Sequence, residues 1–236
     1  MKRKQLLGMV PFYLLAAIVC IGAAQLGSDA VTAAVDASPV VRYHTMVIDA
    51  GHGGIDGGAT SCTGILESQL NLEIALRLDD MMHLLGHDTL MIRTTDKSVY
   101  TSGNTIAAQK VSDIKQRVKT VNETENGFLV SIHQNTFPDG RYRGAQVFYA
   151  PDDNSREVAG ELQTALIHTL NPGSNRKSKK ADGIYLMEHI TRPGVLIECG
   201  FLSNVEEEAK LRSSAYQKKL CAVIATTLCA HFGEGK

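Results

Sequence analysis

Tryptophan is absent from the 236 residues of this chain, and aromatic residues make up only 6% of them. This scarcity argues against a site in which aromatic rings stack on sugars or bases, although tyrosine rings are available for stacking. An excess of one charge is also missing, because 24 basic and 25 acidic residues give a formal net charge of -1. Nucleic-acid-binding domains usually carry a basic excess. We therefore expect no nucleic-acid partner.

Paired cysteines are lacking as well. The five cysteines include no CxxC pair, so the sequence does not indicate a zinc site built from thiolates. Two of them, Cys221 and Cys229, belong to an apolar helical stretch and are expected to be small buried groups. The disulfide state is left open for the four cysteines downstream of the N-terminal segment, namely Cys62, Cys199, Cys221 and Cys229.

A long hydrophobic run occurs only at the N-terminus. Three basic residues, at positions 2–4, precede an apolar stretch that runs from Leu6 to Leu26. This order is typical of an export signal, and about 20 apolar residues are also enough to span a bilayer. We expect residues 1–27 to be a signal peptide or a transmembrane anchor and residues 28–42 to be a linker. The protein would then be exported, either secreted or anchored, and would touch a membrane only through this segment.

Residues 43–236 have the composition of one globular domain, since 44% of the whole chain is hydrophobic and 21% charged. Short apolar runs alternate with stretches whose apolar residues recur every three or four positions. The pattern predicts strands at 45–49, 88–93, 128–132, 144–149, 183–187 and 195–197, and helices at 67–85, around 111–121, at 155–170 and at 214–231. This alternation predicts an α/β fold, with a mostly parallel or mixed twisted sheet covered by helices on both faces.

Ligands of such sheets bind beyond the carboxyl ends of the strands, and three polar side chains fall there. His52 lies in a glycine-rich loop after the first strand, while His133 and Glu198 end two later strands. Imidazole and carboxylate are ligands that suit zinc. The glycine spacing does not fit a dinucleotide site, and the phosphate-binding lysine of a P-loop is missing. Each side chain is also explained singly as a structural residue, and the spacing does not say which carboxylate would complete a metal site.

Five separated blocks then add a resemblance to a known family. They are Asp49–Gly58, Leu66-Glu67, Arg93–Asp96, Ser131–Asn135 and Leu196–Phe201. Together, from about Val47 to the end of the chain, they resemble the zinc-dependent N-acetylmuramoyl-L-alanine amidases. The block at 183–187, which runs into 191–198, is similar to the germination-specific amidases of endospore-forming bacteria, which act on the peptidoglycan of the spore cortex.

The resemblance implies one Zn²⁺ per chain, with His52, Glu67 and His133 as ligands and Glu198 as the catalytic glutamate. It implies hydrolysis of the amide bond between the lactyl group of N-acetylmuramic acid and L-alanine. In the spore, this step precedes formation of muramic-δ-lactam and serves germination. Arg93 and Asn135 match neighbouring positions, where we expect them to support the site or to contact substrate.

The expected partner is a peptidoglycan glycan strand with its stem peptide, together with an activating protein in the manner of some family members. Two alternatives stay open: a zinc peptidase that cleaves another bond of peptidoglycan, and a peptidoglycan-binding protein that is inactive without a partner. A basic run, made of Arg176, Lys177, Lys179 and Lys180, is expected to be a solvated loop. Contact with an anionic wall polymer is the alternative interpretation of this run.

Overall fold

The computed structural model describes residues 45–233, so the predictions for residues 1–27 and 28–42 lie outside the described residues. The strands are β1 (Thr45–Ala50), β2 (Thr89–Met91), β3 (Gly127–Asn135), β4 (Gln146–Tyr149), β5 (Lys179–Lys180) and β6 (Gly194–Phe201). The helices are α2 (Glu67–Leu84), α3 (Ile106–Glu123), α4 (Asp153–Leu170), α5 (Tyr185–His189), α6 (Val205–Leu211) and α7 (Ser214–Gly233). Among these helices, none is both long enough and apolar enough to cross a membrane.

The strands form one mixed sheet in the order β2-β1-β3-β6-β4-β5. Strands β2, β1, β3 and β6 run parallel, whereas β4 is antiparallel to β6. One edge of the sheet therefore collects the carboxyl ends of β1, β3 and β6 together with the beginning of β4. This arrangement confirms the predicted α/β fold and brings the three predicted strand ends to the same edge.

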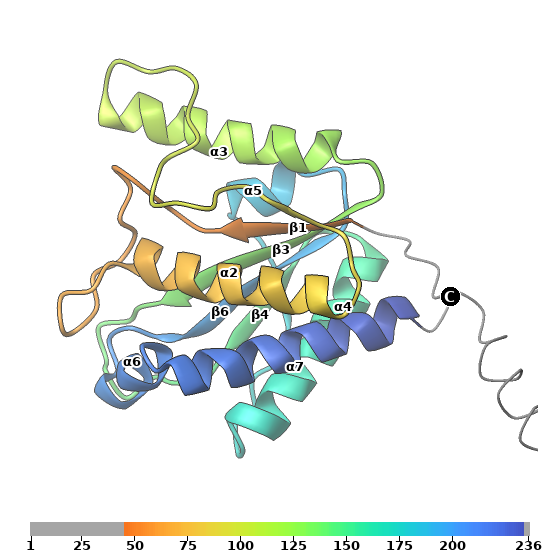
Figure 1. Cartoon of the computed structure of the whole chain (residues 1–236). Helices are drawn as coiled ribbons and strands as arrows, with labels where there is room; N and C mark the ends of the chain where they lie inside the picture. The colour runs from red at the N-terminus through yellow and green to blue at the C-terminus, as the bar shows by residue number, and fades with distance from the viewer. Residues whose placement is uncertain (1–44, 234–236) are drawn as a thin grey trace, which may run out of the picture. The chain divides into compact units, whose positions relative to one another are not determined.

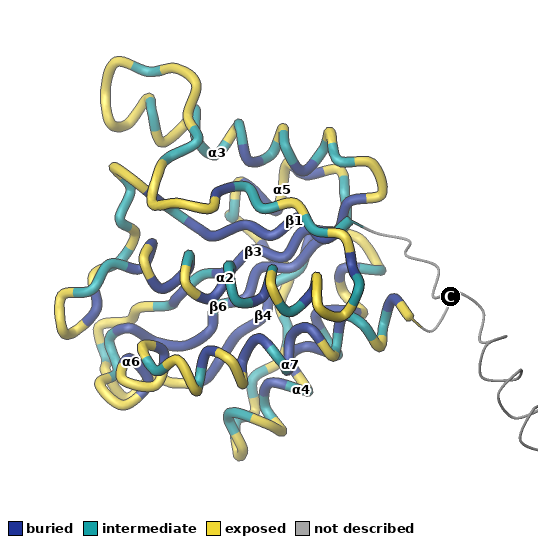
Figure 2. Tube along the Cα trace, viewed as in Figure 1, coloured by how far each residue is buried: buried dark blue, intermediate teal, exposed yellow. Residues whose placement is uncertain are grey.

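Helices cover both faces of the sheet, as predicted (Figure 1). In β3, Phe128, Val130 and Ile132 pack into a core formed with α2, α4 and α7, while Leu129 packs into a second core on the side of α3 and α5. The alternation arises because successive side chains of a strand point to opposite faces. Figure 2 shows the central strands buried along most of their length, so the ends of the strands are fixed by a rigid interior.

The strand predicted at 183–187 is wrong. Gly183 adopts a positive φ of 79° and its N–H donates to Glu188 Oε1 at 2.6 Å, after which α5 begins at Tyr185. Leu186 and Met187 are buried from this short helix. Periodicity does not separate a short buried helix from a short buried strand, which accounts for the error.

Two short elements, β5 and α6, are absent from the predicted pattern. Strand β5 arises from the end of the basic run, where Lys179 and Lys180 pair with β4. Helix α6 begins after Asn204, whose Oδ1 accepts the N–H groups of Glu206 and Glu207. An asparagine before a helix is a recognised start signal, but seven residues carry too little periodicity to reveal the helix.

The four cysteines of the described residues are free thiols. Cys199 and Cys221 are buried, Cys229 is partly buried and Cys62 is exposed. The prediction of a small buried group is therefore confirmed for Cys221 and holds only in part for Cys229. Packing rather than covalent cross-linking stabilises the domain in this structure.

Candidate metal centre and active site

The glycine-rich loop after β1 runs close to the end of β3. At Gly51, any side chain would collide with the imidazole ring of His133, so only glycine lets the two segments approach this closely. The next residue, His52, has a positive φ of 61°, a conformation that costs a non-glycine residue roughly 1–2 kcal/mol. The surrounding contacts must therefore hold the loop in place.

Arg93 supplies many of those contacts from the segment that follows β2. Its side chain is buried and donates hydrogen bonds to the carbonyl oxygens of Ala50 at 2.8 Å, Gly51 at 3.0 Å and Ser68 at 2.9 Å. These bonds join the loop after β1 to the beginning of α2. Arg93 thus supports the backbone around the site.

A second buried arginine, Arg117 of α3, holds the same loop from the other side. It donates to the carbonyl oxygen of His52 at 2.7 Å and forms ion pairs with Asp49 and Asp113. Burial alone would raise the pKa of Asp49, but the charge of Arg117, with help from His133 and a hydrogen bond from Ser131, holds that pKa below its usual range. Asp49 is therefore a charged anchor at the end of β1.

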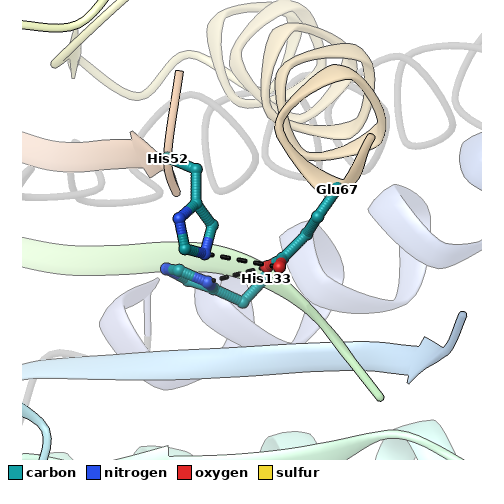
Figure 3. Close-up of side chains that lie close together, drawn as sticks. All are labelled: His52, Glu67 and His133. Atoms are coloured by element: carbon teal, nitrogen blue, oxygen red, sulfur yellow. Dashed lines mark hydrogen bonds and ion pairs between the residues drawn. The ribbon is translucent and has the colours of Figure 1, made fainter. Parts of the chain in front are cut away.

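Three predicted ligands converge beyond the edge of the sheet (Figure 3). His52 Nε2 lies 3.3 Å from Glu67 Oε2, and His133 Nδ1 lies 3.0 Å from Glu67 Oε1. The two imidazole rings meet edge to face, with centroids 5.0 Å apart. One donor atom from each residue lies within 4.8 Å of the others, so the group can hold a metal ion.

Glu67, the first residue of α2, is oriented by several donors. The N–H of Ala59 donates to its Oε2 at 2.9 Å, while Asn71 Nδ2 and the N–H of Gln134 each donate to its Oε1 at 3.2 Å. Burial opposes ionisation, but hydrogen bonds with His133 and His52 outweigh it and hold the pKa of Glu67 far below its usual range. The carboxylate is therefore negatively charged and fixed in direction.

His52 is positioned by Asp56, a residue to which the sequence patterns give no role. Its Nδ1 lies 2.9 Å from Asp56 Oδ2, and Asp56 Oδ1 in turn accepts a hydrogen bond from Lys110 Nζ of α3 at 2.7 Å. Burial alone would lower the pKa of His52, but Glu67 and Asp56 together raise it to about 9. The only signal in the sequence was the position of Asp56, four residues after His52 in the same loop.

Glu198 lies beside this group on β6, where it pairs in register with His133 of β3. Its Oε2 atom is buried and has no hydrogen-bond partner among residues 45–233. Burial raises the pKa of Glu198 to about 7; the charge of His133 opposes the rise, and the Glu67 carboxylate adds to it. A carboxyl group with such a pKa can both accept and release a proton near neutral pH.

Asn135 ends β3 two residues beyond His133, and its carbonyl oxygen accepts the N–H of Leu202 at 2.8 Å. The hydrogen bond that orients the His133 ring is made with Glu67 instead. Contact between Asn135 and substrate stays a prediction.

The donor set fits a divalent ion. Ligand atoms about 2.1 Å from a tetrahedral zinc ion lie roughly 3.4 Å from one another. One ligand atom each of His52, Glu67 and His133 lies within 4.8 Å of the other two, so small side-chain shifts would reach this spacing. Two nitrogens and one oxygen leave a fourth position for water or substrate, as in catalytic rather than structural sites. The unpartnered oxygen of Glu198 supplies a proton acceptor at the same edge.

Comparisons with known proteins agree with this arrangement. The family described as N-acetylmuramoyl-L-alanine amidase matches residues 46–230. A germination-specific N-acetylmuramoyl-L-alanine amidase of Bacillus subtilis is 38% identical over 189 residues, which cover 79% of each chain. The amidase LytC of the same species is 27% identical, with 79% of this chain matching 35% of that one.

Solved structures show the same fold. The CwlD amidase of Clostridioides difficile, determined in complex with the GerS lipoprotein, is 35% identical, with a TM-score of 0.76 over 80% of this chain and 98% of that one. An N-acetylmuramoyl-L-alanine amidase from Clostridium difficile 630 is 28% identical, with a TM-score of 0.71 over 83% of this chain and all of that one. With its fold, its strand-end histidines and the family match in agreement, the chain belongs to the N-acetylmuramoyl-L-alanine amidases, which are hydrolases of peptidoglycan.

Proposed function

We propose that the protein binds one Zn²⁺ through His52, Glu67 and His133 and uses it to hydrolyse the amide bond between the lactyl group of N-acetylmuramic acid and L-alanine. The observation that carries this proposal is the unpartnered buried oxygen of Glu198, set beside a group of two imidazoles and one carboxylate. When bound, zinc lowers the pKa of a water molecule toward about 7 and polarises the carbonyl group that is attacked.

Glu198 is the catalytic glutamate of this proposal. Its carboxylate accepts a proton from the attacking water, whose oxygen bonds to the lactyl carbonyl carbon. The bond between that carbon and the L-alanine nitrogen then breaks, and Glu198 returns the proton to the leaving amine. Burial raises the pKa of Glu198 above that of an ordinary glutamate, which strengthens its carboxylate as a proton acceptor. The products are a muramic acid with a free lactyl carboxylate and a stem peptide with a free L-alanine amine.

The remaining charged groups keep the ligands in position. Asp56 directs the His52 ring and is itself held by Lys110, and Arg93 and Arg117 fix the carbonyl groups of the loop that carries His52. Such contacts orient metal ligands and raise their affinity for the ion. Asn135, at the end of β3, is a substrate contact in this proposal.

The biological substrate that we propose is the peptidoglycan of the spore cortex, where removal of stem peptides precedes formation of muramic-δ-lactam and serves germination. The similarity to the germination-specific amidase of B. subtilis supports this assignment. We also propose that the protein is exported through its N-terminal segment and acts outside the cytoplasm. The complex of the C. difficile relative with a lipoprotein supports an activating protein partner here.

The decisive experiment digests purified cortex peptidoglycan with the full chain, with Glu198→Gln and with the control Glu125→Gln, an exposed glutamate between α3 and β3. Mass spectrometry reads the products, and elemental analysis reads the zinc content. We expect the parent to release peptides that begin with L-alanine only when zinc is present. Glu198→Gln should lower the rate about 10²- to 10⁴-fold while keeping one zinc per chain, because the glutamine still fills the site but accepts no proton.

Other outcomes separate the alternatives. Peptides that lack the amino-terminal L-alanine would identify a peptidase. Intact muropeptides from a zinc-loaded parent, with or without an added lipoprotein partner, would favour a peptidoglycan-binding protein. Full activity of Glu198→Gln would remove the catalytic role from Glu198.

A further inference from the structure

A groove with a volume of about 870 Å³ lies at the same edge of the sheet as the metal-binding group. It is bounded by the loop that joins β3 to β4, by the loop after α4 and by helix α6, and Figure 1 places α6 at the end of the sheet where the loop after β1 also lies. None of the residues assigned to the proposed reaction lines this groove.

The walls of the groove are held by buried contacts. Glu207 of α6 is buried, and its two oxygens accept the N–H groups of Gly144 at 2.7 Å and Phe201 at 2.9 Å. Arg176 Nε donates to the carbonyl oxygen of Arg143 at 3.1 Å, and its guanidinium lies 5.0 Å from the centre of the Phe201 ring. The groove is therefore preformed.

Cations dominate the side chains that are available to a ligand. Of the acids lining the groove, Asp139 pairs with Arg141 at 2.7 Å and Glu207 is saturated by backbone N–H groups, which leaves Glu206. Three basic residues also line the groove, namely Arg143, Arg176 and Lys210. None of the three forms an ion pair with a residue of the described range 45–233. The groove therefore favours an anion.

The distance between Glu198 and the groove indicates which part of the substrate can reach the groove. Gln146 of β4 pairs in register with Glu198, and Gly144, which lines the groove, precedes Gln146 by two residues. With about 3.3 Å per residue along a strand and about 4.8 Å between strands, the groove begins roughly 8 Å from the backbone of Glu198. An extended peptide spans the same distance in about three residues. A glycan strand whose lactyl groups are in amide linkage offers no carboxylate there, whereas a stem peptide carries at least its own terminal carboxylate.

We infer that this groove binds the stem peptide of the substrate, through ion pairs between its carboxylates and Arg143, Arg176 and Lys210. The inference rests on the proposed function, because it takes the peptide to leave the site along β6. The inference also assigns a role to Arg176 of the basic run, because Arg176 lines the groove. Lys177 and Lys179 of the same run do not line it.

The test compares the full-length, zinc-loaded parent with the double variant Arg143→Gln/Lys210→Gln. The matched control is Lys177→Gln/Lys179→Gln, which removes the same charge outside the groove. Two substrates are used: muropeptides with free peptide carboxylates, and the same muropeptides with those carboxylates amidated. We expect the parent to favour the free-carboxylate substrate about tenfold in kcat/KM, chiefly through KM. The double variant should lose this preference, and the control should keep it.

Calorimetric titration with the released stem peptide gives a readout that needs no turnover. The parent and the control should bind it at least tenfold more tightly than the double variant does. Equal losses on both substrates, or an unchanged preference in the double variant, would overturn the inference. If the parent cleaves neither substrate but still binds the peptide in a way that depends on Arg143 and Lys210, the proposed function fails while the groove assignment stands.

Discussion

Two loops leave the same edge of the sheet and differ in how they are held. The buried arginines Arg93 and Arg117 fix the loop at 51–66, after β1, because they donate to the carbonyl oxygens of Gly51 and His52. The loop at 136–145, after β3, carries exposed side chains such as Phe137 and Tyr142 and a surface ion pair between Asp139 and Arg141, and the buried Glu207 holds it near its end, at Gly144.

The difference matches what each loop does in the proposed mechanism. A metal ligand must be held to within a fraction of an ångström, and buried, saturated contacts provide that precision. A surface that receives a peptide needs accessible charge and apolar area instead. Buried arginines under the loop at 51–66, against largely exposed side chains in the loop at 136–145, distinguish the segment that carries His52 from the neighbouring one.

The largest effect is expected when the buried charge under the first loop is removed. Arg117→Met would leave Asp49 buried without its partner, which typically costs about 3–5 kcal/mol of stability. Urea unfolding followed by circular dichroism measures it. Arg141→Met is the control in the second loop, where Arg141 is exposed and Asp139 is half-buried, and its unfolding midpoint should not move. Equal effects in the two variants would contradict the distinction between the loops.

The second-largest effect is expected from a steric change at the candidate metal site. Gly51→Ala would drive a methyl group into the ring of His133, so we expect zinc affinity to fall about 100-fold in competition with a chelator. The control is Gly160→Ala in α4, where an added Cβ meets no atom within 4 Å. It should bind zinc as the parent does and be stabilised by about 0.5–1 kcal/mol. Normal zinc affinity in Gly51→Ala would show that the two segments can separate without cost.

Loss of the carboxylate behind His52 should have a smaller effect. Asp56→Asn keeps the shape of the side chain but weakens its hold on the imidazole and on Lys110, and we expect zinc affinity to fall about tenfold. Asp139→Asn makes the same change in the second loop and should leave zinc affinity as it is. Unchanged zinc affinity in Asp56→Asn would show that Glu67 alone orients His52.

Acid should weaken the first loop through Asp49. Its pKa in the folded protein lies below the ordinary value of 3.8, so the unfolded chain takes up the proton first as the pH falls. The contribution of Asp49 is therefore complete well above pH 3.8 and is lost as the pH drops through the folded value, by at most about 1.4 kcal/mol per pH unit. Urea midpoints between pH 6 and pH 3 should show this slope, and Asp49→Asn should flatten it.

The smallest effect is expected in the second loop. Tyr142 is 46% exposed, and its ring packs against that of Phe137 with ring centres 4.4 Å apart. Tyr142→Ala should cost about 0.5–1 kcal/mol in thermal unfolding and should not alter zinc affinity. A loss of zinc binding in this variant would mean that the second loop also helps to hold the metal-binding group.

Much of the fold could be predicted from local pattern. The nearly continuous apolar run from Phe128 to Ile132 in β3 indicates a strand buried on both faces, and the three- to four-residue spacing along α2 indicates a helix with one buried side. Short elements were not predictable in this way: 183–187 was predicted to be a strand but contains the start of α5, and α6 was not predicted at all. A segment of five to seven residues carries too few repeats to define a period.

The candidate site likewise has features that the sequence determines and features that only the tertiary structure shows. The positions of His52, His133 and Glu198 after or at the ends of buried runs were determined by the sequence itself, because parallel strands bring their carboxyl ends to one edge. The tertiary structure alone decided that Lys110 holds Asp56, that Arg117 reaches the loop from α3, and that Arg143 and Lys210 face a common groove. Hydrophobic periodicity reports which side of an element is buried, whereas these contacts join residues 54 or more positions apart and depend on how the packed helices sit on the sheet.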